Sequence, residues 1–375
     1  MQIIATWTLT AALSIVPVSG VDLPSPIDVK CALPGALERA LLRAARLDAA
    51  DVRLHGVCEG NFKITGGRVT LRAASPGSGF AVAQDDPGIA PVLEVVDAIA
   101  VLRGTIVRGG VVGLLVHGHD AELLLIETEV YDQRDAALIA EDGAELRLFD
   151  TTVRDGNVGV VVQSGSLANV QRSHLSGFDA AMIVADASFA ALSDTVIENN
   201  RVGGLNVTDR SDANVLGGAF RENAQVHVNA NDWSGVSLLS GVELGSPGDT
   251  TQFAFGATRN SRVSCASTPD IYGGISVLDG ASVRLSNATV EGDFLALAFA
   301  DAIVRNGSVS GIVFCSDGAD VICSQTTSGG VIGCPSTSCG PPPAAHLGEI
   351  SRVPRLPDIQ LPRFLRNRVA ADAQK

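Results

Sequence analysis

The sequence predicts an all-β protein, a parallel β-solenoid in which each turn takes about 22 residues. Short apolar alternations recur at nearly fixed spacing, and no helical period lies between them. Hydrophobic residues make up 46% of the 375 residues, yet aromatic residues make up only 4%. The core must therefore be filled by Val, Leu, Ile and Ala in regular layers, which is typical of stacked repeats.

The repeat is clearest at the apolar residue that precedes each polar corner. Successive units recur every 22 or 23 residues, at Val107, Val130, Val153, Leu175, Ile197 and Phe220. A second apolar alternation follows each corner, at residues 136–140, 158–162, 180–184 and 202–207. A third segment closes each unit, at residues 144–150, 166–172, 188–194 and 212–218, and a further unit covers residues 281–293. Three period-2 strands per unit predict a solenoid turn rather than a βαβ unit.

Each strand should pair with its equivalent one turn on, about 4.8 Å away, so that every sheet is parallel. Inward positions then stack apolar residue on apolar residue, and we expect the opposite positions to be polar and solvated. In the segment TVIENNRVGGLNV, Asn199 and Asn200 form a corner, because asparagine tolerates left-handed backbone angles. The spacing of leucine-rich repeats and the six-residue period of hexapeptide helices are both absent from the sequence.

The N-terminal region predicts export and a cap. Residues 1–20 contain an apolar run that ends in small residues, typical of a secretory signal peptide cleaved near Gly20; the alternative is a buried first strand. Residues 21–49 form a cap segment with an amphipathic helix, in which Leu37, Leu41 and Leu42 fall on one face. We expect no membrane span after removal of the signal, because no other long apolar stretch follows.

These columns resemble those of right-handed parallel β-helix proteins of the pectin-lyase-like superfamily, over residues 50–335. Residues 31–73 resemble the N-terminal cap of bacterial members, in which a cysteine precedes a helix and a strand ends in G-x-C. The resemblance implies a single-stranded right-handed parallel β-helix over residues 50–339. It also implies polysaccharide as the class of ligand and a bacterial source.

Two stretches interrupt the period. Residues 73–92 and 245–274 are rich in turn-forming residues, and we expect both to loop out of the solenoid. Phe253, Phe255 and Tyr272 make the second loop a candidate binding wall, and the alternative is a disordered surface loop. Residues 340–375 form a tail whose six prolines and net positive charge predict either a plain disordered terminus or an extended segment that lies along the acidic body or engages a partner.

Seven cysteines are typical of an oxidising compartment. Cys31 and Cys58 flank the cap helix, and disulfides are favoured over a metal site because no CxxC occurs. Close spacing suggests Cys315 with Cys323 and Cys334 with Cys339, which leaves Cys265 over.

The formal net charge of −14 argues against nucleic acid as a partner. Catalysis or ion binding would require charged side chains that stack on consecutive corners. Asp132 and Asp155 occupy equivalent positions one turn apart, so together they could hold calcium, and with Arg154 they are the candidate catalytic group. Candidate carbohydrate-binding residues lie in neighbouring columns: Arg134, Asp135, Glu198, Arg201, Arg221 and Glu222.

One short motif touches a known catalytic segment. Residues 117–120, HGHD, share their last two letters with the DPHD segment of alginate epimerases. Because they lie where a strand leaves the period, we interpret the match as accidental.

The sequence therefore predicts an exported monomer, located in the periplasm, on the cell surface or outside the cell. Its leading function is that of a non-catalytic scaffold that contacts glycans or another envelope component through its outer corners. The alternative is a polysaccharide lyase, epimerase or hydrolase. Calcium is the one cofactor that the residues suggest.

Overall fold

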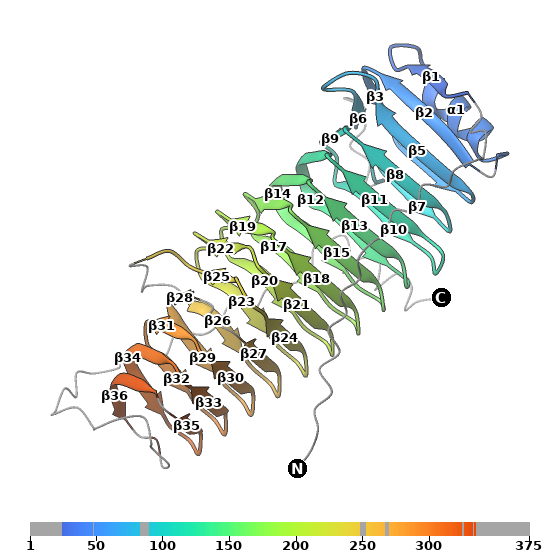
Figure 1. The fold of residues 1–375 in the computed structure, drawn as a ribbon. Helices are drawn as coiled ribbons and strands as arrows, with labels where there is room; N and C mark the ends of the chain where they lie inside the picture. The colour runs from blue at the N-terminus through green and yellow to red at the C-terminus, as the bar shows by residue number, and fades with distance from the viewer. Residues whose placement is uncertain are drawn as a thin grey trace.

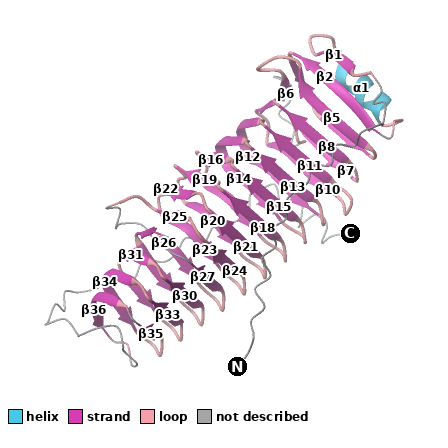
Figure 2. Ribbon diagram, viewed as in Figure 1, coloured by secondary structure: helices cyan, strands magenta, loops and turns pink. Residues whose placement is uncertain are grey.

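The computed structural model is an elongated β-solenoid with one short helix at its N-terminal end, among the described residues (Figures 1 and 2). It describes residues 25–47, 49–82, 90–247, 253–266, 270–324, 326–332 and 334. The predicted signal peptide, Cys339 and the C-terminal tail lie outside the described residues. Every strand pairing is parallel, as the 22-residue columns predicted.

Side one of the solenoid is a 14-stranded sheet, whose first strand, β1, belongs to the cap segment. The other strands contribute one to each of about 13 turns, more than the ten or so that the sequence suggested. Its strands are β1 (Ile27–Lys30), β2 (Ala49–His55), β5 (Arg68–Ala73), β8 (Ile99–Arg103), β11 (Glu122–Ile126), β13 (Glu145–Phe149), β15 (Leu167–Gln171), β18 (Phe189–Ser193), β21 (Asp212–Leu216), β24 (Gly235–Leu238), β27 (Arg262–Ala266), β30 (Ser282–Ser286), β33 (Asp301–Arg305) and β35 (Asp320–Ser324).

Sides two and three are formed by a second, 22-stranded sheet. Side two contains β3 (Val57–Glu59), β6 (Gly79–Ala81), β9 (Ile106–Arg108), β16 (His174–Ser176), β19 (Val196–Glu198), β22 (Ala219–Arg221), β25 (Glu243–Leu244), β28 (Asp270–Tyr272) and β31 (Thr289–Glu291). Side three contains β4 (Phe62–Thr65), β7 (Leu93–Val96), β10 (Val112–His117), β17 (Ala180–Val184), β20 (Gly203–Val207), β23 (Val226–Ala230), β26 (Phe253–Ala257), β29 (Gly274–Val277) and β32 (Phe294–Ala296). Strands β12 (Glu129–Glu141), β14 (Thr152–Val162) and β34 (Ser308–Cys315) pair with strands of both sides, and β36 (Thr327–Ile332) pairs with β34.

The predicted register is confirmed. Val107 pairs with Val130, Val130 with Val153, and Val153 with Leu175. The column continues through Ile197 to Phe220, and its members are fully buried. Each turn therefore buries its aliphatic side chains against those of the next turn, which is how a chain with few aromatic residues fills a continuous core.

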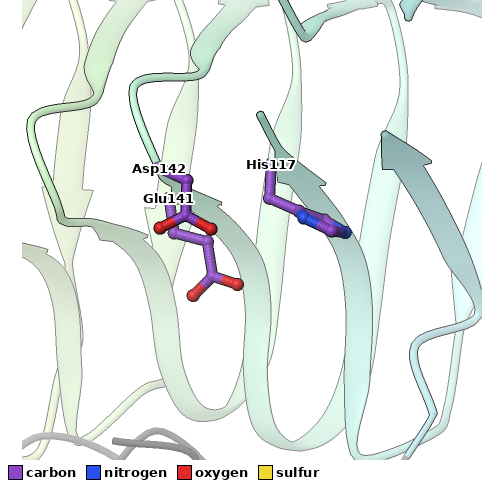
Figure 3. Close-up of side chains that lie close together, drawn as sticks. All are labelled: His117, Glu141 and Asp142. Carbon is purple, nitrogen blue, oxygen red and sulfur yellow. The ribbon is translucent and has the colours of Figure 1, made fainter. Parts of the chain in front are cut away.

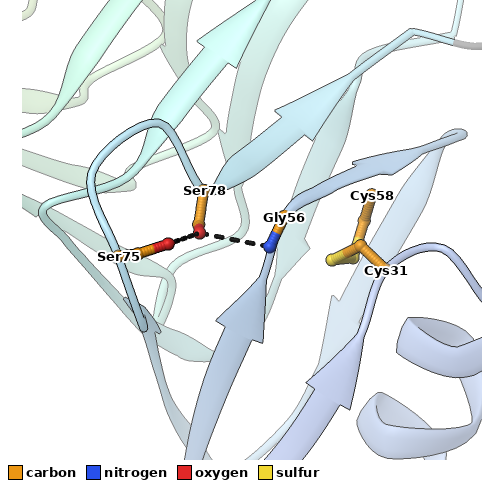
Figure 4. The surroundings of a disulfide bond; sticks show 5 residues. All are labelled: Cys31, Gly56, Cys58, Ser75 and Ser78. Atoms are coloured by element: carbon orange, nitrogen blue, oxygen red, sulfur yellow. Dashed lines mark hydrogen bonds between the residues drawn. A yellow bond between two sulfur atoms is a disulfide. The ribbon is translucent and has the colours of Figure 1, made fainter.

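Helix α1 (Ala36–Ala44) covers the open end of the solenoid beside β1. Its buried residues are Leu37, Ala40, Leu41 and Ala44, at the i, i+3, i+4, i+7 spacing of one helix face. Our placement of Leu42 on that face is wrong, because Leu42 lies about 100° around the helix from Leu41 and is exposed. The predicted disulfide between Cys31 and Cys58 is present and ties the cap to the first turn (Figure 4).

The expected loop at residues 245–274 is instead a turn of the solenoid. It contains β26, β27 and β28, and Phe255 pairs with both Val228 and Ile275 in the buried core. Phe255 is therefore a core residue and not part of a binding wall. The sequence between Leu244 and Phe253 is longer than the equivalent sequence between Phe220 and Val226, and this extra length interrupts the 22-residue period. In the first irregular stretch, β6 continues the solenoid, and residues 83–89 lie outside the described part.

The outward positions of side three differ from the polar, solvated surface that we expected. A second apolar cluster lies there, and its buried members are Val112, Leu115, Ala136, Ile139, Val158, Val161, Ala180, Ile183 and Ala185. We call these residues the outer apolar cluster. Segments such as "VGVVV" are apolar at every position, a pattern typical of strands buried on both faces.

The close-in-sequence pairings of Cys315 with Cys323 and of Cys334 with Cys339 are both wrong, because Cys315 is bonded to Cys334. Strand β34, which ends at Cys315, pairs with β36, which comes just before Cys334, whereas Cys323 lies on side one. Cys265 is a buried free thiol, and burial raises its pKa to about 12. A thiol this buried is not placed to pair between molecules.

Candidate functional site

The bend between sides two and three, which we call the corner, contains one left-handed residue in each of five consecutive turns. The corner column contains Asp132, Asp155, Gly177, Asn199 and Glu222, with φ values of 63°, 61°, 78°, 57° and 51°. Asn, Asp and Gly tolerate this conformation better than other residues do. The backbone therefore accounts for most of the residue types in this column.

Asn200, the second asparagine of the ENN segment, stabilises the bend through side-chain hydrogen bonds. Asn200 is buried, and its Oδ1 accepts a hydrogen bond of 3.0 Å from the backbone N–H of Phe178. Its Nδ2 donates to Oδ1 of Asn223 at 2.7 Å, and Asn223 in turn donates to the carbonyl oxygen of Ile197. This asparagine ladder satisfies backbone groups at the bend that burial would otherwise leave unpaired.

Arg154 and Asp155, two of the predicted catalytic residues, are in contact. The Arg154 guanidinium donates to Asp155 at 2.6 Å and to Glu129 Oε1 at 2.8 and 2.9 Å, and it lies 4.5 Å from the centre of the Tyr131 ring. The hydrogen bond to Glu129 is the main cause that raises the pKa of Arg154 above its ordinary value. Arg154 is therefore a firmly held cation, suited to binding rather than to accepting a proton.

Asp132 and Asp155 lie on consecutive turns, because their flanking residues Tyr131 and Arg154 are register partners. One oxygen of Asp155 bonds Arg154, and the other lies against the following turn, where a Cβ on Gly177 would be 2.7 Å away. Calcium binding by the two aspartates remains a prediction, and it would have to compete with the arginine for Asp155.

Arg201 joins three turns at the corner. Its Nε donates to Asp179 Oδ1 at 2.6 Å, its Nη1 to the carbonyl oxygen of Gly177 at 3.1 Å, and its Nη2 to that of Gly156 at 2.8 Å. A guanidinium held by three hydrogen bonds to three acceptors is preorganised, so it loses little side-chain freedom when it meets a ligand.

The other predicted carbohydrate-binding residues also lie on the corner side. Arg221 pairs with Glu243 on the next turn at 2.7 Å, and Glu198 pairs with His174 on the preceding turn at 3.1 Å. Arg134 and Glu222 are exposed, and Asp135 is partly buried. We call the ion-paired residues on this side the corner row: Glu129, Arg154, Asp155, Asp179, Glu198, Arg201, Arg221 and Glu243.

A second polar group lies on the outer face of side three. His117 ends β10 and Glu141 ends β12, and the two are register partners, with Asp142 next along the chain (Figure 3). One potential ligand atom from each of the three residues lies within 4.8 Å of the others. Among the described residues, this is the one group of three or more His, Cys, Asp or Glu side chains placed closely enough to share a metal ion.

The neighbours of this group fix its orientation. His117 Nε2 lies 2.8 Å from Glu94 Oε1, and Lys63 Nζ lies 3.1 Å from the other oxygen of Glu94. Burial tends to raise the pKa of Glu94, but hydrogen bonds from His117 and Lys63 outweigh it, so this pKa is lowered. On the next turn, Gln163 Nε2 donates to Glu141 Oε2 at 3.0 Å.

Sequence reasoning missed this group because the HGHD segment was interpreted as accidental. The signal was present in the columns. Extending the second alternation by one residue beyond 140 and 162 aligns His117 and Glu141, which end β10 and β12, with Gln163, which directly follows β14.

The chain is similar to known proteins in a family profile and in its fold. A family profile described as a right-handed β-helix region matches residues 97–244. No curated protein matches the sequence. Within the described residues, no helix is long and apolar enough to cross a membrane.

Solved structures with a similar fold include the A-module of the Azotobacter vinelandii mannuronan C-5 epimerase AlgE4. It is 13% identical, with a TM-score of 0.53 over 82% of this chain and 95% of that one. The AlgE6 A-module is 12% identical, with a TM-score of 0.48 over 83% and 92% of the two chains. A tailspike of Acinetobacter phage vb_AbaP_AS12 (gp42) is 9% identical, with a TM-score of 0.46 over 82% and 62%. At 13% identity the likeness to the AlgE4 A-module shows the fold alone, and with the family profile it supports a right-handed parallel β-helix repeat protein.

Proposed function

We propose that this protein is an exported, non-catalytic β-helix that binds polysaccharide through the corner row. The observation that carries the proposal is the repetition of oriented, ion-paired side chains on consecutive turns, from Glu129 to Glu243. Equivalent groups on neighbouring turns are about 4.8 Å apart, comparable with the length of one sugar unit, so a linear polymer could meet similar groups along its length. The disulfides support export.

The chemistry of the corner row favours binding over turnover. Its arginines are held by carboxylates, and its left-handed positions are explained by the bend. The acidic charge of the chain favours a neutral or mixed-charge polysaccharide over a polyanion. The AlgE4 A-module is a mannuronan epimerase by name, which makes polysaccharide the first class of ligand to test.

The test measures binding of the mature chain, residues 21–375, to a panel of neutral and uronate polysaccharides by affinity electrophoresis. Arg201→Ala and Arg221→Ala should each weaken binding several-fold while the circular dichroism spectrum is unchanged. Arg172→Ala is the matched control, because Arg172 forms a similar exposed pair with Asp150 away from the corner row. Equal losses in the control and in the two variants would contradict the proposal.

The alternative function is a polysaccharide lyase, epimerase or hydrolase. The observation that favours it is His117, an imidazole placed between Glu94 and Glu141 on the outer face, where it could transfer a proton. Incubation with the same panel, with and without calcium, should reveal unsaturated products or new reducing ends if the protein is an enzyme. Turnover that is lost in Asp132→Ala, Asp155→Ala or His117→Ala would replace the scaffold with an enzyme.

A further inference from the structure

The group of His117, Glu141 and Asp142 has the composition and spacing of a metal site. One nitrogen and two carboxylates supply three ligand atoms within 4.8 Å of one another, a separation that a single ion can bridge. Glu141 is 4% exposed, so its carboxylate is largely removed from water. Burying a carboxylate is costly unless a cation or hydrogen bonds compensate it.

The histidine is prepared as a ligand by a carboxylate behind it. With Nε2 donating to Glu94, the lone pair of the imidazole is on Nδ1. Glu94 belongs to β7 and Glu141 to β12, on opposite sides of β10, so the ring lies between the two carboxylates. Ligating histidines in proteins commonly donate their other N–H to a carboxylate in this way, which fixes the tautomer and the ring orientation.

A fourth oxygen lies beside the group. Gln163 is 4% exposed, and its Oε1 is a buried acceptor that has no hydrogen-bond partner among the described residues. The same amide is held next to Glu141 through Nε2. A buried, unpaired carbonyl oxygen costs free energy in the absence of a partner. A cation shared with Glu141 would supply one.

We propose that His117, Glu141 and Asp142, with Gln163 as a fourth oxygen donor, bind a divalent transition-metal ion of the zinc class. The imidazole is the discriminating ligand. Calcium takes six to eight oxygen ligands, whereas zinc is bound by about four nitrogen, sulfur or oxygen atoms. This site is separate from the corner row and does not depend on the proposed polysaccharide binding.

The test uses the mature chain without a polyhistidine tag, stripped of metal by a chelator. Isothermal titration calorimetry with Zn²⁺ should give one equivalent of bound zinc. Bound zinc should also raise the midpoint temperature of thermal unfolding. His117→Ala should abolish stoichiometric binding, and Glu94→Gln should weaken it about 10–100-fold, because Glu94 orients the ligand without contacting the metal. His174→Ala is the matched control, since His174 also pairs with a glutamate, and it should leave zinc binding unchanged.

A measurement on the unmodified protein guards against variants that fail to fold. Addition of Co²⁺ should produce visible absorption of a nitrogen- and oxygen-ligated ion, and one equivalent of Zn²⁺ should remove it. Binding of Ca²⁺ in preference to Zn²⁺, absence of zinc binding, or zinc binding that survives in folded His117→Ala would each overturn the proposal.

Discussion

At the scale of single residues, the left-handed backbone of the corner selects the side chains found there. In the sequence, Asp132, Asp155 and Asn199 are polar residues of one column, and the two aspartates are candidate calcium ligands and catalytic groups. Their positive φ values supply a simpler reason for their presence in this column. A column of aspartates at a bend is therefore weak evidence for catalysis, because the left-handed backbone by itself accounts for aspartate at these positions.

The corner makes a direct prediction at Asn199, whose φ is 57°. Asn199→Ala should destabilise the protein by about 1 kcal/mol, because alanine lacks the short polar side chain that lets asparagine tolerate left-handed angles. Asn199→Gly should be close to neutral, because glycine adopts these angles freely. Urea unfolding measures both. Asn169→Ala, at a strand position of side one, controls for loss of an asparagine side chain. Equal costs for Asn199→Gly and Asn199→Ala would show that the side chain, and not the backbone, matters.

A second residue-scale prediction concerns pH. Partial loss of hydration, with a smaller contribution from Asp209, raises the pKa of Asp186 above its ordinary value of 3.8. The folded state then binds this proton more tightly than the unfolded chain does, so Asp186 costs stability once pH rises through 3.8 and above its folded pKa.

Asp186→Asn should therefore raise the thermal midpoint at pH 7, and the gain should vanish below about pH 3.8. The effect should be roughly 1 °C, since the side chain is exposed and screened by solvent. Asp150→Asn is the contrasting variant: its pairing with Arg172 lowers the pKa of Asp150, so its removal should destabilise at pH 7. A gain for Asp186→Asn that persists at low pH would contradict this origin.

At the scale of elements, the sequence could predict columns but not which outward faces are covered. Val153, Leu175 and Ile197 are found from periodicity because stacking repeats the same environment in every turn. Leu42 was misplaced because two adjacent leucines cannot both occupy the middle of a narrow helix face. The position of His117 beside Glu141 depends on the register between two neighbouring turns. It therefore follows from the columns and not from a local motif such as HGHD.

The outer apolar cluster gives a prediction for strands of side three. Ile139 points outward but is 1% exposed, whereas Leu167, outward on side one, is 47% exposed. Ile139→Ala should cost about 2–4 kcal/mol, as in a core, and Leu167→Ala should cost less than about 1 kcal/mol. Chemical denaturation of both variants provides the comparison. Similar small costs would mean that the outer apolar cluster is open to solvent.

At the scale of the whole molecule, function depends on the register that stacks one turn on the next. Asn169 and Ala191 are register partners on side one, so their separation should suit a disulfide. The double variant Asn169→Cys, Ala191→Cys should oxidise to an intramolecular bond, detectable by mass spectrometry after alkylation. The offset pair Asn169→Cys, Ser193→Cys should not form one, because Ser193 pairs with Gln171. Bonding of the offset pair alone would contradict the register.

The corner row exists only because the turns stack, and this links the fold to its proposed use. Single ion pairs of this kind contribute little to stability, and many proteins carry them. What distinguishes this chain is that the pairs repeat along one edge of the solenoid, from β12 to β25. A repeated surface of this kind is what the proposed binding of a linear polysaccharide requires.

The most direct measurement is the affinity of the mature chain for oligosaccharides of increasing length, prepared from whichever polysaccharide it binds. If the corner row is the binding surface, affinity should rise with each added sugar until the oligomer spans the row. Arg201→Ala, in the middle of the row, should remove most of that gain. Affinity that is independent of length, or an unchanged length dependence in Arg201→Ala, would contradict the account.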